Sequence, residues 1–141
     1  MTMHRFETRQ SVRLLTEIGK GSVKVVATET AETIVEITGR DADQVRVSQD
    51  GDQILVIGPK QHHGFFGGDT RLDAVITVPS ASDVAVRTGS GDITIVGSVA
   101  ETHLKSGSGD LMVDTATGAM VLDTGSGDIR VGRAGDDVKA R

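Results

Sequence analysis

The chain contains no cysteine, tryptophan or tyrosine, and its only aromatic residues are Phe6, Phe65 and Phe66. Without cysteine it can form neither a disulfide framework nor a thiolate metal site, although this leaves its compartment open. With so few aromatic side chains, the core of a folded domain must consist of valine, isoleucine and leucine.

Long apolar runs and an excess of basic residues are also missing. No stretch approaches the ~18 apolar residues of a membrane span, and Met1–Glu7 lacks the apolar run of about 7 residues or more that a secretory signal requires. The 15 basic and 20 acidic residues give a net charge of -5, which disfavours nucleic acid or an anionic membrane as a partner. We therefore expect a soluble, cytoplasmic chain that binds no cofactor.

Glycine, in contrast, is abundant, with 18 residues among 141. The motif Gly-Ser-Gly-Asp occurs at residues 89–92, 107–110 and 125–128, so that successive copies start 18 residues apart. A fixed period indicates one structural unit that stacks on copies of itself.

Segments of alternating apolar and polar residues lie on both sides of each motif, as in Val84–Thr88 and Ile93–Ile95. Such alternation is typical of half-buried strands. The columns expected to point inward are Val84, Thr102, Met120 and Val138; Val86, Leu104, Leu122 and Ala140; Ile93, Leu111 and Ile129; and Ile95, Val113 and Val131. We predict an all-β fold, a parallel β-solenoid-like stack of 18-residue coils with two short strands per coil.

The motif is expected to turn the chain between the two strands of a coil. Its glycines permit positive φ, and its aspartate can accept hydrogen bonds from turn amides. The residues assigned to these structural turns are Gly89, Gly91, Asp92, Gly107, Gly109, Asp110, Gly125, Gly127 and Asp128. Thr88, Ser106 and Thr124 precede the turns on the inward side, where their hydroxyls can bond to each other or to the backbone along the stack.

The N-terminal half is less regular, although Gly19–Val26 matches the pattern of Gly89–Val96. Asp50-Gly51 is a hairpin signal, and Pro59–Thr70 is expected to be a loop. Further strands are expected at Thr33–Thr38, Val45–Ser48, Ile54–Gly58 and Leu72–Val78. We predict a single domain, residues 1–141, with an irregular β cap at 1–80 and the repeat region at 84–141.

The repeat region stops inside a fourth copy of the repeat, which predicts that it is truncated there. The matching residues are Val138, Lys139, Ala140 and Arg141. An unpaired strand edge would lie at this point. We expect this edge to pair with a protein partner or with a second copy of the chain.

Five features in order resemble a bacterial β-strand-repeat family known as "putative adhesin", which is related to toastrack domains of unknown function. They are Phe6, the Gly-x-Val-x-Val segment Gly21–Val25, the hairpin at Val45–Ile57, the loop Phe65–Gly68 leading to Ile76–Pro79, and the repeats. The resemblance covers most of the chain and implies no activity, catalytic residue or cofactor, although some relatives take part in envelope-stress signalling. Family members usually continue through further repeats, so the stop at Arg141 departs from the pattern.

The aspartates of the motif are candidate calcium ligands. Asp92, Asp110 and Asp128 would stack into an acidic ladder, and glycine-rich β-rolls bind calcium between such turns. Those rolls have a Gly-Asp turn at both ends of each coil, whereas the opposite turns here share no motif. Structural capping of the turns is therefore favoured over calcium.

The predicted loop contains other candidate residues. His62 and His63 are adjacent, but a zinc site would need further ligands, and Asp69, His4 and His103 are the remaining candidates. Phe65 and Phe66 either form an exposed contact or cover the apolar end of the stack.

No combination of residues indicates catalysis. Gly89–Gly91 lacks the lysine and the following helix of a phosphate loop, and the repeats lack the aromatic platforms of sugar-binding solenoids. We therefore expect a non-enzymatic, adhesin-like scaffold or protein-interaction module that acts through strand edges or sheet faces. The alternatives are a sensor or ligand-binding module of a bacterial envelope-stress system and a calcium-binding β-roll.

Overall fold

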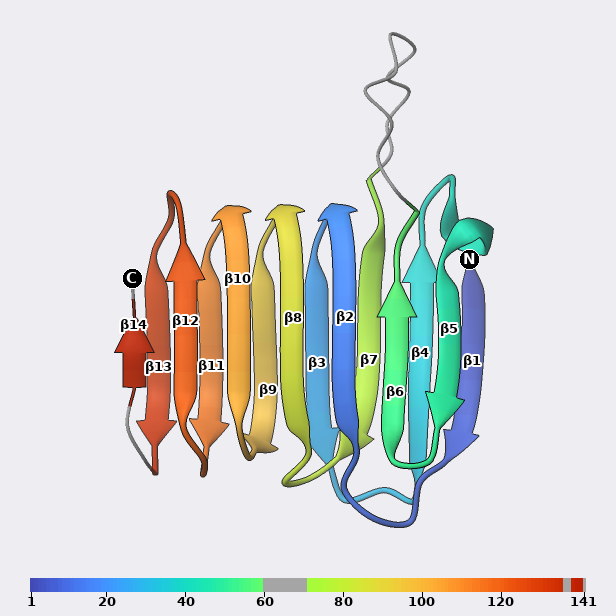
Figure 1. The fold of residues 1–141 in the computed structure, drawn as a ribbon, viewed down its shortest axis with the longest axis horizontal. Helices are drawn as coiled ribbons and strands as arrows, with labels where there is room; N and C mark the ends of the chain where they lie inside the picture. Colours follow the sequence, from blue (N-terminus) through green and yellow to red (C-terminus); the bar gives the residue numbers. More distant parts are fainter. Residues whose placement is uncertain (60–70, 136–137, 141) are drawn as a thin grey trace, which may run out of the picture.

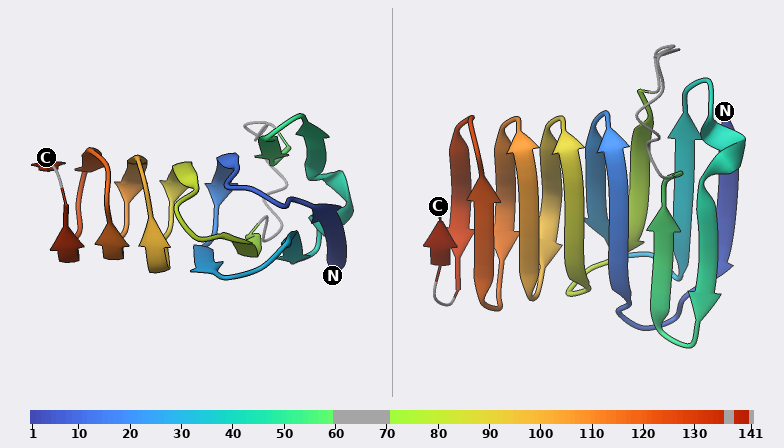
Figure 2. Two further views of the ribbon diagram at one scale, coloured as in Figure 1. Left: turned by 90° about the horizontal axis from the view of Figure 1, so that it is seen from below. Right: turned by 45° about the horizontal axis from the view of Figure 1, so that its top comes forward.

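The computed structural model describes residues 1–59, 71–135 and 138–140, and most of these residues lie in β-strands. The strands form two seven-stranded sheets, which face each other as two layers (Figures 1 and 2). Outside the strands, the regular structure of the described residues is limited to one 3₁₀ turn at Ala42–Gln44. The prediction of an all-β fold is confirmed.

Both sheets extend from one end of the molecule to the other. In spatial order, the first sheet contains β1 (Thr2–Glu7), β4 (Glu32–Thr38), β7 (Asp73–Pro79), β3 (Val23–Thr28), β9 (Ile93–Val99), β11 (Leu111–Ala116) and β13 (Ile129–Ala134). The second contains β14 (Val138–Ala140), β12 (Met120–Thr124), β10 (Thr102–Ser108), β8 (Asp83–Ser90), β2 (Arg13–Lys20), β6 (Gln53–Ile57) and β5 (Arg46–Asp50). Thus β1 and β5 lie at one end and β13 and β14 at the other (Figure 1).

Each strand of the repeat region pairs in parallel with its equivalent in the next repeat. Thr102 pairs with both Val84 and Met120, and this offset of 18 residues is the period of the motif. We use "coil" for a strand of the second sheet, the corner after it and the following strand of the first sheet. The coils are then β2–β3, β8–β9, β10–β11 and β12–β13.

One bulge interrupts this register. Between β9 and β11, Val113 pairs with Ile95, but Thr115 pairs with Ser98, so that the offset falls to 17 residues. The Gly97 amide at the bulge donates a hydrogen bond of 3.1 Å to Asp114 Oδ2. The extra residue therefore has a polar partner on the neighbouring strand.

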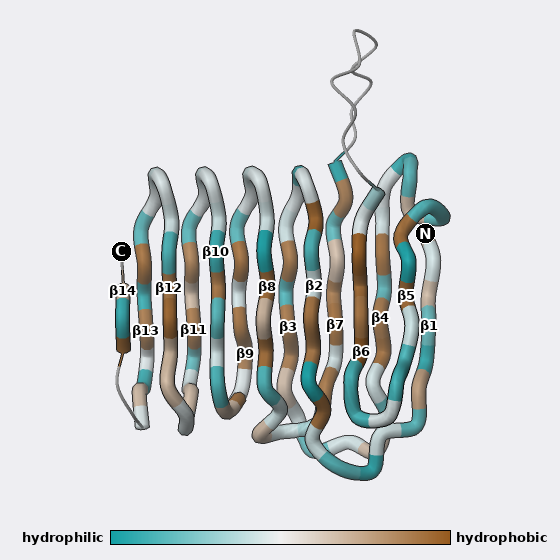
Figure 3. Tube along the Cα trace, in the orientation of Figure 1, coloured by the Kyte–Doolittle hydropathy of each residue, from teal (hydrophilic) through white to brown (hydrophobic). Residues whose placement is uncertain are grey.

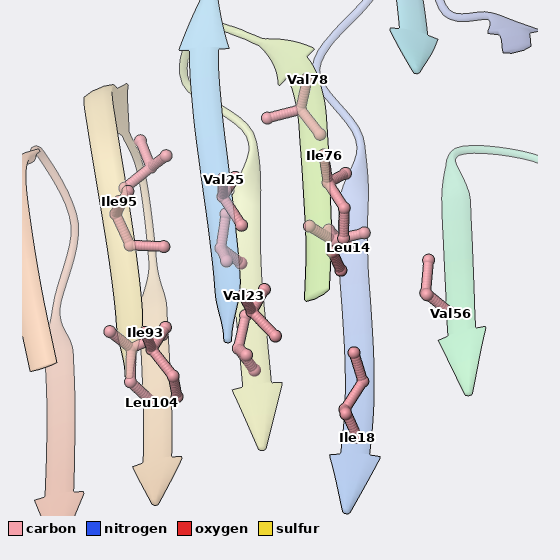
Figure 4. Close-up of a cluster of buried hydrophobic side chains, with 14 of the residues drawn as sticks. Leu14, Ile18, Val23, Val25, Val56, Ile76, Val78, Ile93, Ile95 and Leu104 are labelled. Carbon is pink, nitrogen blue, oxygen red and sulfur yellow. The ribbon is translucent and has the colours of Figure 1, made fainter. Parts of the chain in front are cut away.

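Aliphatic side chains from both sheets fill the space between the layers (Figure 4). Brown, apolar positions alternate with teal, polar ones along the strands, as expected for strands with one buried face (Figure 3). Most of the predicted inward columns are fully buried, with Ile93, Leu111 and Leu122 at 0% exposure. Ile129 and Val131 are only partly buried, and Val138 is 40% exposed.

The N-terminal half differs from the predicted irregular cap of residues 1–80. Leu14 on β2 pairs in parallel with Val84, and Val23 on β3 pairs in parallel with Ile93. The coil β2–β3 therefore lies inside the stack, between β6 and β7 on one side and the repeats on the other. This placement requires glycine at the corner, since a Cβ at Gly89 would lie 2.5 Å from the Gly19 carbonyl oxygen.

The antiparallel part is confined to the far end of the stack. There β1 pairs with β4, β4 with β7, and β5 with β6. The hairpin predicted from Asp50-Gly51 joins β5 to β6, and Gly51 has a φ of +61°.

Candidate interaction edge

The Gly-Ser-Gly-Asp corners join the strands of successive coils and stack on one another. The second glycine has a φ of +140° in Gly91, +141° in Gly109 and +142° in Gly127, a region that L side chains rarely adopt. A Cβ at Gly109 would lie 2.2 Å from the Gly91 carbonyl oxygen, and one at Gly127 would lie 2.1 Å from the Gly109 oxygen. The carbonyl of each coil thus occupies the space that a side chain of the next coil would need.

The first glycine of the motif is equally confined. A Cβ at Gly107 would lie 2.4 Å from the Gly89 carbonyl oxygen, and one at Gly125 would lie 2.4 Å from the Gly107 oxygen. Both glycines of a corner therefore pack directly on the backbone of the preceding coil.

Hydroxyl groups connect the corners on the inward side. The Ser106 hydroxyl lies 3.0 Å from the Gly91 carbonyl oxygen of the preceding coil, and the Thr124 hydroxyl donates to the Gly109 oxygen at 2.8 Å. The Thr88 hydroxyl in turn donates to Ser106 Oγ at 3.0 Å. These hydroxyls therefore bond along the stack, to one another and to carbonyls.

The aspartates form a ladder of backbone contacts. Asp92 Oδ1 accepts the amide of Asp110 at 2.8 Å, and Asp110 Oδ1 accepts the amide of Asp128 at 2.9 Å. The described residues contain no group of three or more His, Cys, Asp or Glu side chains arranged to hold a metal ion. Calcium binding by this column stays a prediction.

An equivalent contact occurs in the N-terminal half, which sequence reasoning missed. Ser22 occupies the position of the aspartate, and its hydroxyl and amide donate to Asp73 Oδ1 at 2.7 and 3.3 Å. The Ser22 hydroxyl, with smaller contributions from the Ser22 amide and the Arg71 guanidinium, holds the pKa of Asp73 below its usual value, against an opposing effect of burial. The match between Gly19–Val26 and the motif was the available signal for Ser22.

At the far end of the repeats, the described residues include the corner Gly125–Asp128 but no complete coil after it. We define the C-terminal edge as β13, β14 and the corner Gly125–Asp128. β14 pairs with β12 in the position of the first strand of a coil, but no described residue follows it with a corner or with a strand beside β13. Of the predicted edge residues, Val138, Lys139 and Ala140 form β14, and Arg141 lies outside the described residues.

Hydrogen-bond donors line this edge. The amides of Gly91 and Ile93 donate to carbonyls of the next coil, Ser108 and Asp110, at 2.8 and 3.0 Å. Gly127 and Ile129 are the equivalent residues of the last coil, and their amides have no such partner within the described part of the chain.

Two other surfaces are exposed. Met3, Val75, Val96 and Met112 are 37 to 48% exposed and alternate with buried residues of the first sheet, so they face away from the second sheet. A shallow groove on the outer face of the second sheet is lined by residues that include Leu15, Ala85, His103 and Val121. Arg87, Lys105 and Asp123 also line this groove.

The remaining candidates are separated or lie outside the description. His4 is on β1 of the first sheet and His103 on β10 of the second, so the structure does not bring them together. His62, His63, Phe65, Phe66 and Asp69 lie outside the described residues. No helix in the described ranges has the length and apolar character needed to cross a membrane.

Solved structures with a similar arrangement share little sequence with the chain. A putative cell adhesion protein from Clostridium sporogenes has 8% identity and a TM-score of 0.47, with 99% of each chain covered. A putative adhesin from Bacteroides fragilis has 11% identity and a TM-score of 0.36, covering 99% of this chain and 96% of that one. A putative lipid binding protein from Parabacteroides distasonis has 8% identity and a TM-score of 0.35, with the same coverage.

TM-scores below 0.5 are too low for these likenesses to indicate a function. No curated protein is significantly similar to the chain. The sequence model of one family does match, over residues 12–134, which include the β2–β3 coil and all three motif-bearing coils. The chain therefore belongs to the Toastrack DUF4097 family.

Proposed function

We propose that this chain is a non-enzymatic, adhesin-like β-repeat scaffold that binds a protein partner at its C-terminal edge. The observation that carries the proposal is the change in exposure along one column of the core. Ile93 and Leu111 are completely buried, whereas Ile129, at the same position of the next coil, is only partly covered. The edge thus combines apolar surface with unpaired backbone, the two features that strand addition uses.

The mechanism is the addition of a strand to β13. A partner strand beside β13 would accept the amides of Gly127 and Ile129 and would cover Ile129 and Val131. The same arrangement already holds between β11 and β13, where Leu111 donates to the Asp128 carbonyl at 2.8 Å. The added strand would then extend the solenoid-like stack through the same kinds of contact that join its coils.

A pull-down with a pair of matched variants tests this proposal. Val131→Lys places a charge on the inward side of the edge strand, a device that blocks edge pairing in natural sheets. Met112→Glu alters the outer face of the first sheet and leaves the edge intact. We expect proteins retained by the wild-type chain and by Met112→Glu to be lost with Val131→Lys.

Two results would contradict the proposal. Loss of the retained proteins with Met112→Glu alone would assign the interaction to the sheet face. Equal retention by all three chains would show that the edge takes no part.

A further inference from the structure

We infer that the C-terminal edge selects a segment of another polypeptide in which a serine or threonine is followed by Gly-x-Gly and then by a strand. This inference rests on the proposed function and names its partner. It follows from three contacts that recur between successive coils. At the edge, the last coil supplies its groups for each contact, and the described residues supply no partner for them.

The first contact is steric. In two successive steps of the stack, a Cβ on the second glycine would lie 2.1 to 2.2 Å from the carbonyl oxygen of the preceding coil. The carbonyls of Gly125 and Gly127 hold that place for an incoming segment. A partner with a side chain at either corner position could not approach closely enough to form the backbone hydrogen bonds.

The second contact is a hydroxyl donor. The carbonyl oxygens of Gly91 and Gly109 each lie within 3.0 Å of a hydroxyl from the next coil, that of Ser106 or Thr124. In both cases the hydroxyl belongs to the residue just before the first glycine of the corner. The Gly127 carbonyl offers the same acceptor to an incoming serine or threonine.

The third contact is the aspartate ladder. Asp92 and Asp110 each accept the amide of the equivalent residue one coil later. The Asp128 carboxylate accepts no amide from the described residues, and its side chain is exposed. It would accept the amide of the residue after the Gly-x-Gly, and a hydrogen bond to a charged acceptor is stronger than one between neutral groups.

The position of β14 determines which part of a further coil the partner must supply. β14 already occupies the place of the first strand beside β12, so the incoming segment begins at the corner and continues as one strand along β13. A folded second copy does not fit this description, because Gly91, Gly109 and Gly127 already pack on carbonyls within their own chain. The occupant is therefore an extended segment.

A peptide with the sequence of residues 106–119 tests the inference, since it carries the corner Ser-Gly-Ser-Gly-Asp and the strand that follows. Titration into the ¹⁵N-labelled chain should give saturable shifts at the amides of Gly127 and Ile129. Gly109→Ala in the peptide should weaken binding by about tenfold or more. Ser108→Ala, whose side chain is exposed at this corner, should change the affinity by less than about twofold.

Variants of the chain locate the contact. Asp128→Ala removes the free acceptor of the ladder and should weaken peptide binding by about fivefold or more. Asp123→Ala removes a carboxylate from the outer face of β12 and is the control for loss of charge. Binding that is indifferent to Asp128→Ala, or equal for the Gly109→Ala and Ser108→Ala peptides, would overturn the inference.

A fusion that appends residues 106–119 directly after Arg141 tests whether the added corner and strand must belong to the same chain or can come from another polypeptide. If the fusion melts at a higher temperature but the free peptide does not bind at millimolar concentration, the edge accepts such a coil only within one chain, and a partner in trans is excluded. Edge-dependent capture of proteins without peptide binding would overturn this inference and leave the proposed function standing. Failure of both would overturn both.

Discussion

At the N-terminal end of the stack the outer strands reverse direction, whereas at the C-terminal edge they stay parallel to their neighbours. Phe6 on β1 and Val47 on β5 pack against the core at the first end. The Gln49 side chain on β5 donates to the Glu7 carbonyl at 3.4 Å and so links the end strands of the two sheets. At the other end, Ile129 and Val131 are likewise partly buried and pack against the core.

The two ends of the described stack therefore differ in the direction of their outer strands. At the N-terminal end the outermost strands β1 and β5 run antiparallel to their neighbours, so the arrangement found between successive coils is not repeated there. The C-terminal edge keeps the geometry of the interior, because β13 pairs with β11 in the same register that the earlier coils use. Under the proposed function, a partner at this edge would repeat the contacts already formed between coils inside the molecule.

The largest expected loss of stability comes from a glycine in a stacked corner, compared with a glycine in the N-terminal hairpin. Gly109→Ala would bring a Cβ to 2.2 Å from the Gly91 carbonyl oxygen and should lower the free energy of unfolding by more than about 3 kcal/mol. Gly51→Ala, in the N-terminal hairpin, meets nothing within 4 Å and should cost about 1 kcal/mol for its positive φ. Denaturant unfolding measures both, and equal losses would show that stacking does not constrain the corner.

Two isoleucines, one on β4 beneath the end strand β1 and one on the outermost strand β13, test how completely the core is closed at each position. Ile37→Ala removes a side chain that is 0% exposed on β4 and should cost about 3 to 4 kcal/mol. Ile129→Ala, on half-covered β13, should cost about 1 kcal/mol, since less apolar surface is buried there. If the Ile129 variant loses as much as the Ile37 variant by the same unfolding measurement, the edge is already covered in solution.

Two threonines on the inward side of the second sheet should respond to valine with opposite signs. The Thr16 hydroxyl is buried without a hydrogen-bond partner, so Thr16→Val should stabilise the chain by about 1 kcal/mol. Thr88→Val would remove a donor that bonds Ser106 and should destabilise by about 1 kcal/mol. Melting temperatures of the two variants should therefore move in opposite directions, and shifts of the same sign would contradict the assignment of these contacts.

The smallest expected effect concerns the carboxylate at the N-terminal side of the ladder. The pKa of Asp73 in the folded chain lies below its usual value, chiefly because of the Ser22 hydroxyl. Asp73 therefore contributes stability above that value, and the contribution disappears as the pH falls through the lowered pKa. Because the side chain is 47% exposed, screening limits the effect to on the order of a few tenths of a kcal/mol.

Ser22→Ala removes the hydroxyl that donates to Asp73. The pKa of Asp73, followed by NMR titration of its carboxyl carbon, should then rise towards its usual value. Thr30→Ala, which removes a hydroxyl that accepts the Glu32 amide, should leave the titration of Asp73 unchanged. An unaltered pKa in the Ser22 variant would assign the shift to the Ser22 amide and to Arg71 instead.

The repeated half could be predicted in detail because its information is local and periodic. Ile93 and Leu111 fall in one column at a spacing of 18, and the structure buries both of them. The bulge that pairs Thr115 with Ser98 was not predictable, since the extra residue is absorbed within an otherwise constant period. The contact between Ser22 and Asp73 joins residues 51 apart in the chain, and no repeat connects them.

By itself, the sequence determined that the chain is all β and that successive motifs stack with an offset of 18 residues. The reason is that glycine without a Cβ is the residue that fits beneath the carbonyl of the coil before it. Only the tertiary structure decided that the β2–β3 coil enters the stack between β6–β7 and β8–β9, and that strand direction reverses at one end alone. Those features depend on which strands become neighbours in a sheet. Backbone hydrogen bonds alone do not determine this, because they form equally well for many different strand orders.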